Sequence, residues 1–500
     1  MTIVTKYPST WNRLMINRAQ KLEGLRAGGV DPFRQTKFVR THLAAEISKA
    51  CAGLENEAAW PKEVVVAGRI MAIRNFKRLA FIHLEDESGK LQIMLSVDKL
   101  GPAEFEKFAK FIEVGDYLGI SGDTFRTKTG EVTLGAESFT VLAKALRPLP
   151  EKWRGLQDDE VRQRQRYLDL ASSPAVRERF RQRSQVVWLM REYLHNNGFM
   201  EVETPILQEL HGGAAARPFV THHNALDMEL YLRIATELHL KRLIAGGYER
   251  VFEIGRVFRN EGIDRRHNPE FTSMEVYWAY ADYEDMMRLT EQCVSSITSG
   301  IHGRTRVDYQ GTPIDFTPPW KRLTMEEAVA QIGGVETMGI STEKLREIAL
   351  QKGIPLEDSL GRGWIINTLF EVLVEKQLTQ PTFVYRYPVE TTPLAKRSPD
   401  DPNYVDRFEA YVAGMELANA FSELNDPLDQ RARFEEQAAK LAGGDEEAQP
   451  FDEDFIQAIE IGMPPTGGLG IGIDRLAMVL TDSPSIRDVV LFPTMKHKEK

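Results

Sequence analysis

The segment FRNEGIDRRHNPEFTSMEVY, residues 258–277, constrains this chain more than any other stretch. It brings together arginines, a histidine, carboxylates and an aromatic ring. Arginines can hold an anionic phosphate, carboxylates can hold a cation beside it, and a ring can stack on a base. The segment therefore predicts a nucleotide site, and the rest of the fold has to support it.

A second segment, GLGIGIDRL at residues 468–476, adds glycines that let a ligand approach the backbone closely. Arg475, which follows them, can meet a phosphate or stack on a base. The sequence has no GxxxxGK[ST] segment, which argues against a P-loop ATPase. Arginines, carboxylates and a ring supply positioning, cationic clamps and metal ligands rather than a nucleophilic triad.

The first third of the chain predicts a small barrel. Residues 11–28 mix apolar and basic residues at helical spacing and end at glycines, which predicts an amphipathic helix. Five β-rich runs lie between residues 64 and 146, with an expected helix at 102–111. Five such strands suit an OB-fold, a barrel that binds oligonucleotides on one sheet face.

The predicted domains are an N-terminal helical segment at 1–61, an OB-fold domain at 62–146, a proline-punctuated linker at 147–160 and a catalytic domain at 161–500. The catalytic domain should begin with a long helix that has Ser173 as N-cap and Pro174 in its first turn. One face of this helix is apolar: Val176, Phe180, Val187, Met190 and Leu194. The run GFMEVETPIL then predicts a strand closed by Pro205. Short strands and helices alternate in the remainder, which predicts an α+β domain with an antiparallel sheet flanked by helices.

Composition excludes several classes of protein. Cys51 and Cys293 form no CxxC pair, so neither a disulfide scaffold nor a structural zinc site is expected. No apolar run is long enough for a membrane span or a signal peptide, so we expect a soluble cytoplasmic protein. The formal charge of −10 argues against indiscriminate nucleic-acid binding. Residues 1–60 nevertheless carry nine basic and five acidic residues, consistent with a defined RNA footprint or with a solvated helix face.

The two motifs resemble the second and third signature motifs of class II aminoacyl-tRNA synthetases, and residues 173–205 resemble the first motif, which builds a dimer interface in that family. The runs RPFVTHHNALDMELYLRIATELHLKRLIAGG and PVETTPLAKR are most similar to the bacterial lysine-specific members. This resemblance implies a homodimer that condenses L-lysine and ATP to lysyl-adenylate with Mg²⁺. The lysyl group would then pass to the 3′ end of tRNA(Lys).

The resemblance also assigns the nucleotide site. Arg259 matches the catalytic arginine that bridges the amino-acid carboxylate and the α-phosphate. Glu261 is expected on the same strand face as Arg259, where it would meet the adenine amino group. The remaining ATP contacts are assigned to His267, Asn268, Phe271, Glu416 and Arg475.

The charge of the predicted pocket indicates the substrate. Glu275 and Tyr277 are two residues apart and so lie on one face of a strand, where a carboxylate and a hydroxyl suit a substrate ammonium. By resemblance, the lysine site also includes Arg259 and five further residues: Gly213, Glu237, Asn419, Phe421 and Glu423.

The resemblance assigns Glu416 and Glu423 to magnesium, which prefers carboxylate oxygens shared with substrate phosphates. They are seven residues apart, a spacing that a helix places on one face and a regular strand divides between two faces. Both assignments therefore require irregular geometry at this point.

For the barrel, the resemblance assigns the reading of anticodon uridines to Arg74, Phe81, Gln92 and Glu131. An exposed ring with an amide beside it is a common way to specify single-stranded RNA. Taken alone, Phe81 is equally compatible with the barrel core. The first hairpin, RNFKRLAF, lacks the glycine before a lysine that family members commonly carry.

Three alternatives stay open at this point. A synthetase for aspartate or asparagine shares the architecture, although Glu275 would repel a carboxylate substrate. A lysine ligase acting on a protein is disfavoured, because such relatives generally lack the barrel. A non-catalytic RNA-binding paralogue is disfavoured by the presence of the matched site residues Arg259, Glu261, Glu416, Glu423 and Arg475.

Overall fold

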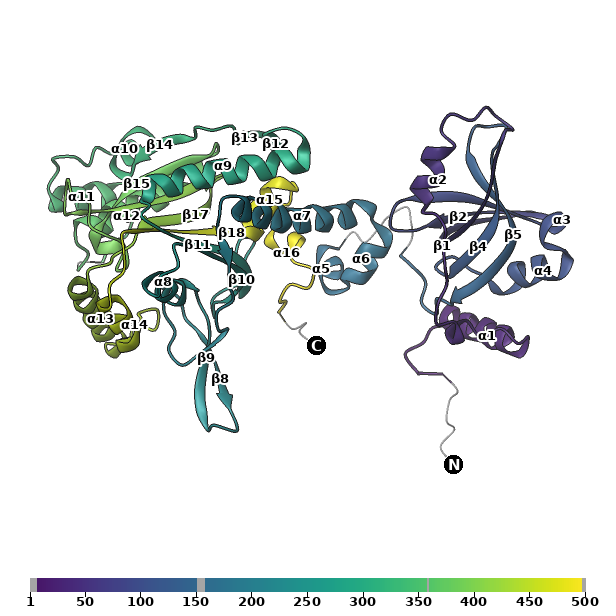
Figure 1. The fold of residues 1–500 in the computed structure, drawn as a ribbon, viewed down its shortest axis with the longest axis horizontal. Helices are drawn as coiled ribbons and strands as arrows, with labels where there is room; N and C mark the ends of the chain where they lie inside the picture. The colour runs from purple at the N-terminus through teal and green to yellow at the C-terminus, as the bar shows by residue number, and fades with distance from the viewer. Residues whose placement is uncertain (1–6, 151–157, 358, 497–500) are drawn as a thin grey trace. The chain divides into compact units, whose positions relative to one another are not determined.

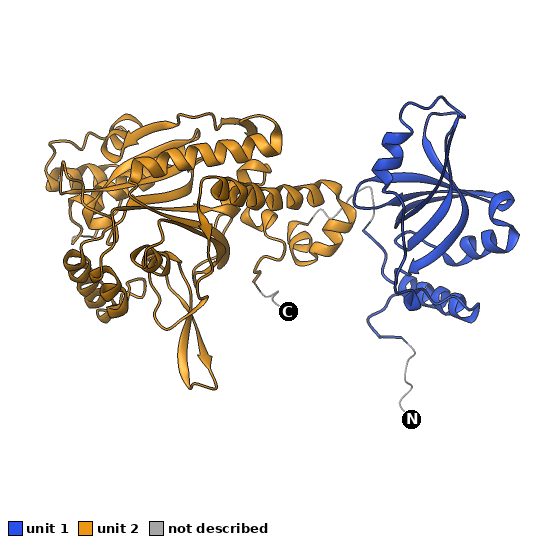
Figure 2. Cartoon of the chain, viewed as in Figure 1, with its two compact units in different colours: residues 1–157 blue, residues 158–500 orange. Residues whose placement is uncertain are grey.

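The computed structural model describes residues 7–150, 158–357 and 359–496. The chain forms two compact units, Met1–Gln157 and Asp158–Lys500 (Figure 2). Of the linker predicted at 147–160, residues 151–157 lie outside the described residues.

Unit 1 is built on a closed barrel with the strand order β1-β2-β3-β5-β4 (Figure 1). Strands β3 and β5 pair parallel, and the other neighbours pair antiparallel. The strands are β1 (Ala59–Asn75), β2 (Leu79–Glu85), β3 (Lys90–Ser96), β4 (Tyr117–Arg126) and β5 (Val132–Ala143). The helices are α1 (Arg13–Ala27), η1 (Pro32–Arg34), α2 (Ala44–Ala50), α3 (Val97–Leu100) and α4 (Pro102–Phe111).

The five strands predicted for the barrel are confirmed, as are the helices expected at 11–28 and 102–111. The barrel forms because apolar residues alternate along its strands. On β2, Ile82 and Leu84 are buried in the core, whereas Phe81 and His83 are only partly buried. Phe81 therefore lies on the outer face of the strand rather than in the core of the barrel.

Unit 2 is centred on an eight-stranded sheet with the order β14-β15-β16-β17-β18-β11-β10-β6. The inner strands pair antiparallel, as predicted. The prediction was incomplete at the two edges, where β14 and β6 pair parallel with their neighbours. The strands of this sheet are β6 (Met200–Glu201), β10 (Arg250–Phe258), β11 (Glu270–Ala279), β14 (Lys321–Thr324), β15 (Thr382–Pro388), β16 (Tyr404–Val412), β17 (Met415–Ser422) and β18 (Thr466–Gly472).

Helices cover both faces of this sheet (Figure 1). Helices α7, α9 and α15 share one core with β11, to which β11 contributes Met274 and Val276. Helices α8, α13 and α14 share a second core on the other face, to which β11 contributes Tyr277 and Ala279. This alternation along β11 places Glu275 and Tyr277 on one face of the strand, as predicted.

The helices of unit 2 are α5 (Asp159–Arg164), α6 (Arg166–Ser172), α7 (Pro174–Asn196), α8 (Glu237–Ala245), α9 (Tyr283–His302), α10 (Met325–Gln331), α11 (Thr342–Gln351), α12 (Arg362–Leu373), η2 (Glu375–Gln377), η3 (Val389–Thr391), α13 (Pro427–Ala442), α14 (Glu453–Glu460), α15 (Ile473–Leu480) and α16 (Ile486–Val489). Two smaller sheets consist of β12 (Arg306–Tyr309) with β13 (Thr312–Asp315), and of β7 (Leu207–Gln208), β9 (Met228–Leu232) and β8 (Phe219–His223). Across the described parts of the chain, no helix combines the length and the apolar character that a membrane crossing requires.

The long helix predicted after Ser173 is α7, and the Ser173 side chain accepts a hydrogen bond from Val176 N. Of the five predicted apolar residues, Val176, Met190 and Leu194 are buried together with Val186, Val187 is partly buried against the same core, and Phe180 is partly buried. The strand predicted at residues 198–207 is shorter, because only β6 pairs with β10. Thr204 N donates to the Glu253 carboxylate at 3.1 Å instead of to a strand, and the following Pro205 has no N–H.

Candidate active site and barrel surface

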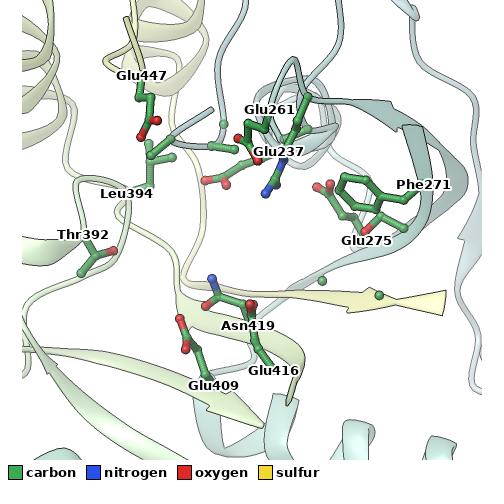
Figure 3. Close-up of a pocket in the computed structure, with 18 of the residues that line it drawn as sticks. Glu237, Glu261, Phe271, Glu275, Thr392, Leu394, Glu409, Glu416, Asn419 and Glu447 are labelled. Carbon is green, nitrogen blue, oxygen red and sulfur yellow. The ribbon is translucent and has the colours of Figure 1, made fainter. Parts of the chain in front are cut away.

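A cavity of about 590 Å³ lies in unit 2, lined by residues of β11, β17, β18 and α8 among others (Figure 3). Its lining contains every residue that the sequence assigned to ATP, lysine or metal: Gly213, Glu237, Arg259, Glu261, His267, Asn268, Phe271, Glu275, Tyr277, Glu416, Asn419, Phe421, Glu423 and Arg475. The fold thus brings together segments more than 250 residues apart in sequence, from Gly213 to Arg475. What each residue binds stays a prediction.

A β-bulge in β17 explains how residues seven positions apart reach this one cavity. Glu416 pairs with Tyr411 and Ala418 with the adjacent Ala410, so β17 carries one extra residue at this point. After the bulge, Ala418 turns to the core while Asn419 lines the cavity. The bulge therefore shifts the alternation by one, and Glu416 and Glu423 both line the cavity.

Arg259 and Glu261 lie beyond the end of β10 at Phe258, so the predicted common strand face is wrong. The chain turns here, because Glu261 N donates to Arg259 O at 2.9 Å. The Arg259 guanidinium lies 5.3 Å from the centre of the Phe271 ring. Its Nε is buried and has no hydrogen-bond partner among the residues that the structure describes. A buried, unsatisfied guanidinium nitrogen is suited to an anion.

A chain of polar contacts links the two predicted nucleotide motifs. Asp264 accepts a hydrogen bond from the His267 ring, with 2.8 Å between Oδ2 and Nδ1. Arg475 Nη2 lies 3.2 Å from His267 Nε2, and Arg475 Nη1 donates to Glu416 Oε2 at 3.1 Å. Burial would raise the pKa of Glu416, but Arg475 and Arg259 outweigh burial and lower it. Glu416 is therefore held as a carboxylate at neutral pH.

The other end of the cavity is acidic. Burial raises the pKa of Glu275 to about 7, although Thr236 N donates to Glu275 Oε1 at 3.1 Å. Burial raises the pKa of Tyr277 well above its usual range, and the carboxylates of Glu237, Glu423 and Glu275 add to this effect. Tyr277 is therefore a neutral hydroxyl among three acidic groups. Such a cluster is suited to a ligand with positive charge.

Gly468 on β18 makes room for one of these carboxylates. A Cβ at this position would lie 1.7 Å from Glu423 Oε1 and 2.9 Å from Tyr277 Cε1. A side chain at this position is therefore incompatible with the observed place of Glu423. The glycines of this strand serve the internal geometry of the cavity in addition to ligand access.

We predict that Gly468→Ala displaces Glu423 and weakens lysine binding by about tenfold or more, because overpacking of this kind commonly costs 1–3 kcal/mol. Isothermal titration calorimetry with lysine would measure the loss. Gly470→Ala is the matched control for stability, since its Cβ would meet nothing closer than Glu275 Cγ at 3.8 Å. A Gly468→Ala variant with the melting temperature and the lysine affinity of the wild type would contradict this account of Gly468.

Sequence reasoning missed three charged residues of this site. Lys241 is fully buried and forms ion pairs with Glu237, at 2.5 Å, and with Glu423. Arg407 and Glu409 line the cavity, and Arg407 Nη2 donates to Glu409 Oε1 at 2.5 Å. The i,i+4 spacing of Glu237 and Lys241, which both lie on α8, was the available signal.

The Arg407–Glu409 ion pair also contacts Asn419, one of the predicted lysine-binding residues. Arg407 Nε donates to Asn419 Oδ1 at 3.1 Å, and Tyr387 OH donates to Glu409 Oε2 at 2.9 Å. Figure 3 shows Asn419, Glu416 and Glu409 on one side of the cavity, facing Glu275 and Phe271 across it. Histidine, cysteine and carboxylate side chains in the described ranges form no group of three or more that could hold a metal ion by themselves.

The residues predicted to read RNA share one outer region of the barrel. Arg74 pairs with Phe81 across β1 and β2, and Arg74 Nη2 donates to Gln92 Oε1 at 3.1 Å. The Gln92 amide in turn donates to Thr133 Oγ1 at 2.8 Å. Glu131, just before β5, forms an ion pair with His83 at 3.5 Å. The exposed ring of Phe76 packs edge-on against Phe81, 6.4 Å between centres.

Comparisons with known proteins agree with both predicted domains, the OB-fold barrel and the catalytic domain. Residues 158–496 match the family of class II tRNA synthetases (D, K and N), and residues 64–142 match an OB-fold nucleic acid binding domain. The chain is 53% identical over 490 residues to a lysine–tRNA ligase of Moorella thermoacetica, covering 98% of this chain and 99% of that protein. A lysine–tRNA ligase of Thermoanaerobacter pseudethanolicus is 51% identical over 488 residues, covering 97% of each chain. One from Listeria monocytogenes is 51% identical over 491 residues, covering 98% of each.

These matches confirm the resemblance that the motifs indicated, and they confirm the predicted combination of an OB-fold with a class II domain. The chain belongs to the family of class II tRNA synthetases that contains these lysine–tRNA ligases.

Proposed function

We propose that this chain is a lysine–tRNA ligase, which activates L-lysine with ATP and transfers the lysyl group to the 3′ end of tRNA(Lys). The observation that carries this choice is the acidic end of the cavity, where Glu237, Glu275 and Glu423 surround Tyr277. Carboxylates suit the two amino groups of lysine and would repel the side chain of an aspartate substrate.

In the first reaction, a lysine carboxylate oxygen attacks the α-phosphorus of ATP. A new P–O bond forms, the bond to the β-phosphate bridge breaks, and pyrophosphate leaves with the displaced electron pair. Arg259 would bridge the lysine carboxylate and the α-phosphate, a role supported by its buried, unpartnered Nε within the described chain. No proton has to move in this step.

The other ATP contacts would come from the residues around Arg259. Phe271 offers a ring for the adenine, and Glu261 and Asn268 line the cavity beside it. His267 and Arg475 would meet phosphate, which their mutual contact supports. For lysine, Gly213 and Glu237 would hold the α-amino group, Glu275, Tyr277 and Glu423 the side-chain ammonium, and Asn419 and Phe421 the wall of the pocket.

Mg²⁺ would be held by Glu416 and Glu423, together with substrate phosphates. The residues fit a hard cation, because both carboxylates line the cavity and Glu423 Oε1 is buried without a hydrogen-bond partner among the described residues. A bound cation would neutralise charge on the phosphate oxygens.

We also propose that two copies of the chain associate through the segment that resembles the first motif, residues 173–205, and the residues that directly follow it. Trp188 on α7 is 60% exposed, and four apolar residues that follow are 40–47% exposed: Met200, Ile206, Leu207 and Leu210. Exposed apolar groups of this kind are typical of a surface that a partner covers. Sedimentation equilibrium of the chain would measure its mass in solution.

In the second reaction, a ribose hydroxyl of tRNA attacks the lysyl carbonyl and AMP leaves. The barrel would select the tRNA by reading its anticodon with Arg74, Phe81, Gln92 and Glu131. The partly buried, outward-facing ring of Phe81 supports this proposal.

We predict that Phe81→Ala raises the tRNA KM and leaves lysine-dependent pyrophosphate exchange unchanged, because it removes one stacking platform worth about 1–3 kcal/mol per base. Aminoacylation and exchange, measured on one preparation, separate the two effects. A normal tRNA KM combined with a markedly lower melting temperature would assign the ring to the stability of the barrel instead.

The function as a whole is tested by ATP–pyrophosphate exchange with each of the twenty amino acids, followed by charging of tRNA transcripts. We expect exchange with lysine alone and charging of tRNA(Lys) alone. Exchange with aspartate or asparagine would overturn the choice of substrate. Lysine-dependent exchange without any tRNA charging would favour a ligase that modifies another acceptor.

A further inference from the structure

Lys241 is fully buried and pairs with two residues that line the acidic end of the cavity, Glu237 and Glu423. It sits four residues after Glu237 on α8, and its Nζ is 2.5 Å from Glu237 Oε1. The same ammonium forms an ion pair with Glu423, just past the end of β17. It also lies 5.6 Å from the centre of the Phe421 ring, a distance at which cation–π attraction contributes.

One lysine ammonium therefore ties together two carboxylates that belong to different elements. The Glu423 carboxylate also packs directly against the backbone of Gly468, where a Cβ would overlap Glu423 Oε1. Glu237 is fixed by its place in the first turn of α8. With Lys241 between them, the distance between the two carboxylates is set by the protein before any substrate arrives.

The same ammonium sets the charge of the pocket. Glu237, Glu275 and Glu423 bring three carboxylates to the acidic end, and Lys241 balances one of them. Arg407 forms an ion pair with Glu409 and also acts electrostatically on Glu237. A buried pocket binds ions well when their charges are matched by partners.

We propose that Lys241 is a positioning residue that determines substrate specificity, by holding the carboxylates of Glu237 and Glu423 in fixed places in the lysine pocket. This inference rests on the proposed activation of lysine. Lys241 is not among the residues that line the cavity, so it acts through the two carboxylates.

The test compares Lys241→Met, which keeps the length and removes the charge, with Lys241→Arg, which keeps the charge. The matched control is Lys344→Met, because Lys344 is an exposed lysine with a single carboxylate partner, Glu347, at 2.8 Å. Each full-length variant is assayed by pyrophosphate exchange for the KM of lysine and of ATP. Each is also assayed for kcat/KM with lysine and with L-ornithine, which is one methylene shorter.

We expect Lys241→Met to raise the lysine KM by about tenfold or more while the ATP KM stays within about twofold. The preference for lysine over ornithine should fall by roughly tenfold, because one methylene is normally discriminated 10- to 200-fold by a fixed pocket. Lys241→Arg should recover most of both losses, and Lys344→Met should match the wild type.

Equal rises in both KM values, or an unchanged preference over ornithine, would overturn the proposal. The proposal would also be overturned if Lys241→Met kept a lower lysine KM and a stronger preference for lysine than Lys241→Arg. That result would mean that Lys241 serves packing. If the methionine variant does not fold while the arginine variant folds and binds lysine normally, Lys241 serves folding and the specificity role is rejected. Absence of lysine-dependent exchange in the wild type would instead overturn the proposed function.

Discussion

Arg259→Ala should reduce lysine-dependent pyrophosphate exchange by about a hundredfold or more and leave the fold intact. Removal of one preorganised charge contact to a developing anion commonly has an effect of this size. Arg259 is placed for such a contact, since its Nε is buried and without a partner in the described chain, and its guanidinium packs on Phe271 at 5.3 Å. The alanine variant would lose the clamp on both reacting groups at once.

The matched control is Arg250→Ala, at the opposite end of β10. The Arg250 guanidinium packs on the Trp278 ring at 4.5 Å and lies outside the cavity lining. This control should exchange pyrophosphate at the wild-type rate. Exchange by the Arg259 variant at a similar rate, with an unchanged melting temperature, would remove Arg259 from the reaction.

Glu275→Gln should weaken lysine binding by roughly 2–5 kcal/mol, or about 30-fold to several-thousand-fold, and leave ATP binding unchanged. The reason is that only the substrate ammonium loses its counter-charge. Titration calorimetry with each ligand measures the two affinities separately, and Glu249→Gln, an exposed glutamate just before β10, is the matched control. Parallel losses for lysine and ATP would place Glu275 outside the lysine pocket.

The raised pKa of Glu275, about 7, gives this prediction a pH dependence. Below pH 7 the carboxyl becomes protonated and cannot pair with an ammonium, so lysine affinity in the wild type should fall with pH in this range. The glutamine variant should lack this dependence. The stability of the fold changes with pH in the opposite direction. The pKa of Glu275 is raised in the folded state, so the free energy of unfolding falls as the pH rises from 4.5, the ordinary pKa of this group, to about 7. Glu275→Gln should therefore melt at a higher temperature than the wild type at pH 8.

Much of the fold could be predicted from the sequence where local pattern and tertiary structure agree. The five barrel strands alternate apolar and polar residues, and their bounds agree within a few residues. Ser173, Pro174 and Gly198 marked the ends of α7, because capping depends on neighbours in sequence. The parallel pairing of the edge strands β14 and β6 was missed, since pairing between distant segments leaves no local signal.

The candidate site, like the fold, could be predicted only where the sequence carries a local pattern. The fourteen residues assigned by motif all line one cavity. Their geometry depends on features without a pattern of their own, such as the bulge in β17 that turns Glu416 inward. The turn that takes Glu261 off its predicted strand is another. Lys241 was missed for a different reason: a lysine next to an arginine on a helix resembles a surface residue until its burial is known.

The central claim is that the acidic end of the cavity selects lysine through both of its amino groups. The most direct measurement is calorimetric titration of the wild-type chain with L-lysine, L-norleucine and 6-aminohexanoic acid. Norleucine lacks the side-chain ammonium, and 6-aminohexanoic acid lacks the α-amino group. A pocket whose buried polar groups are left unpaired rejects such analogues strongly, so we predict that each binds at least about a hundredfold more weakly than lysine. Binding of norleucine with an affinity close to that of lysine would contradict the account.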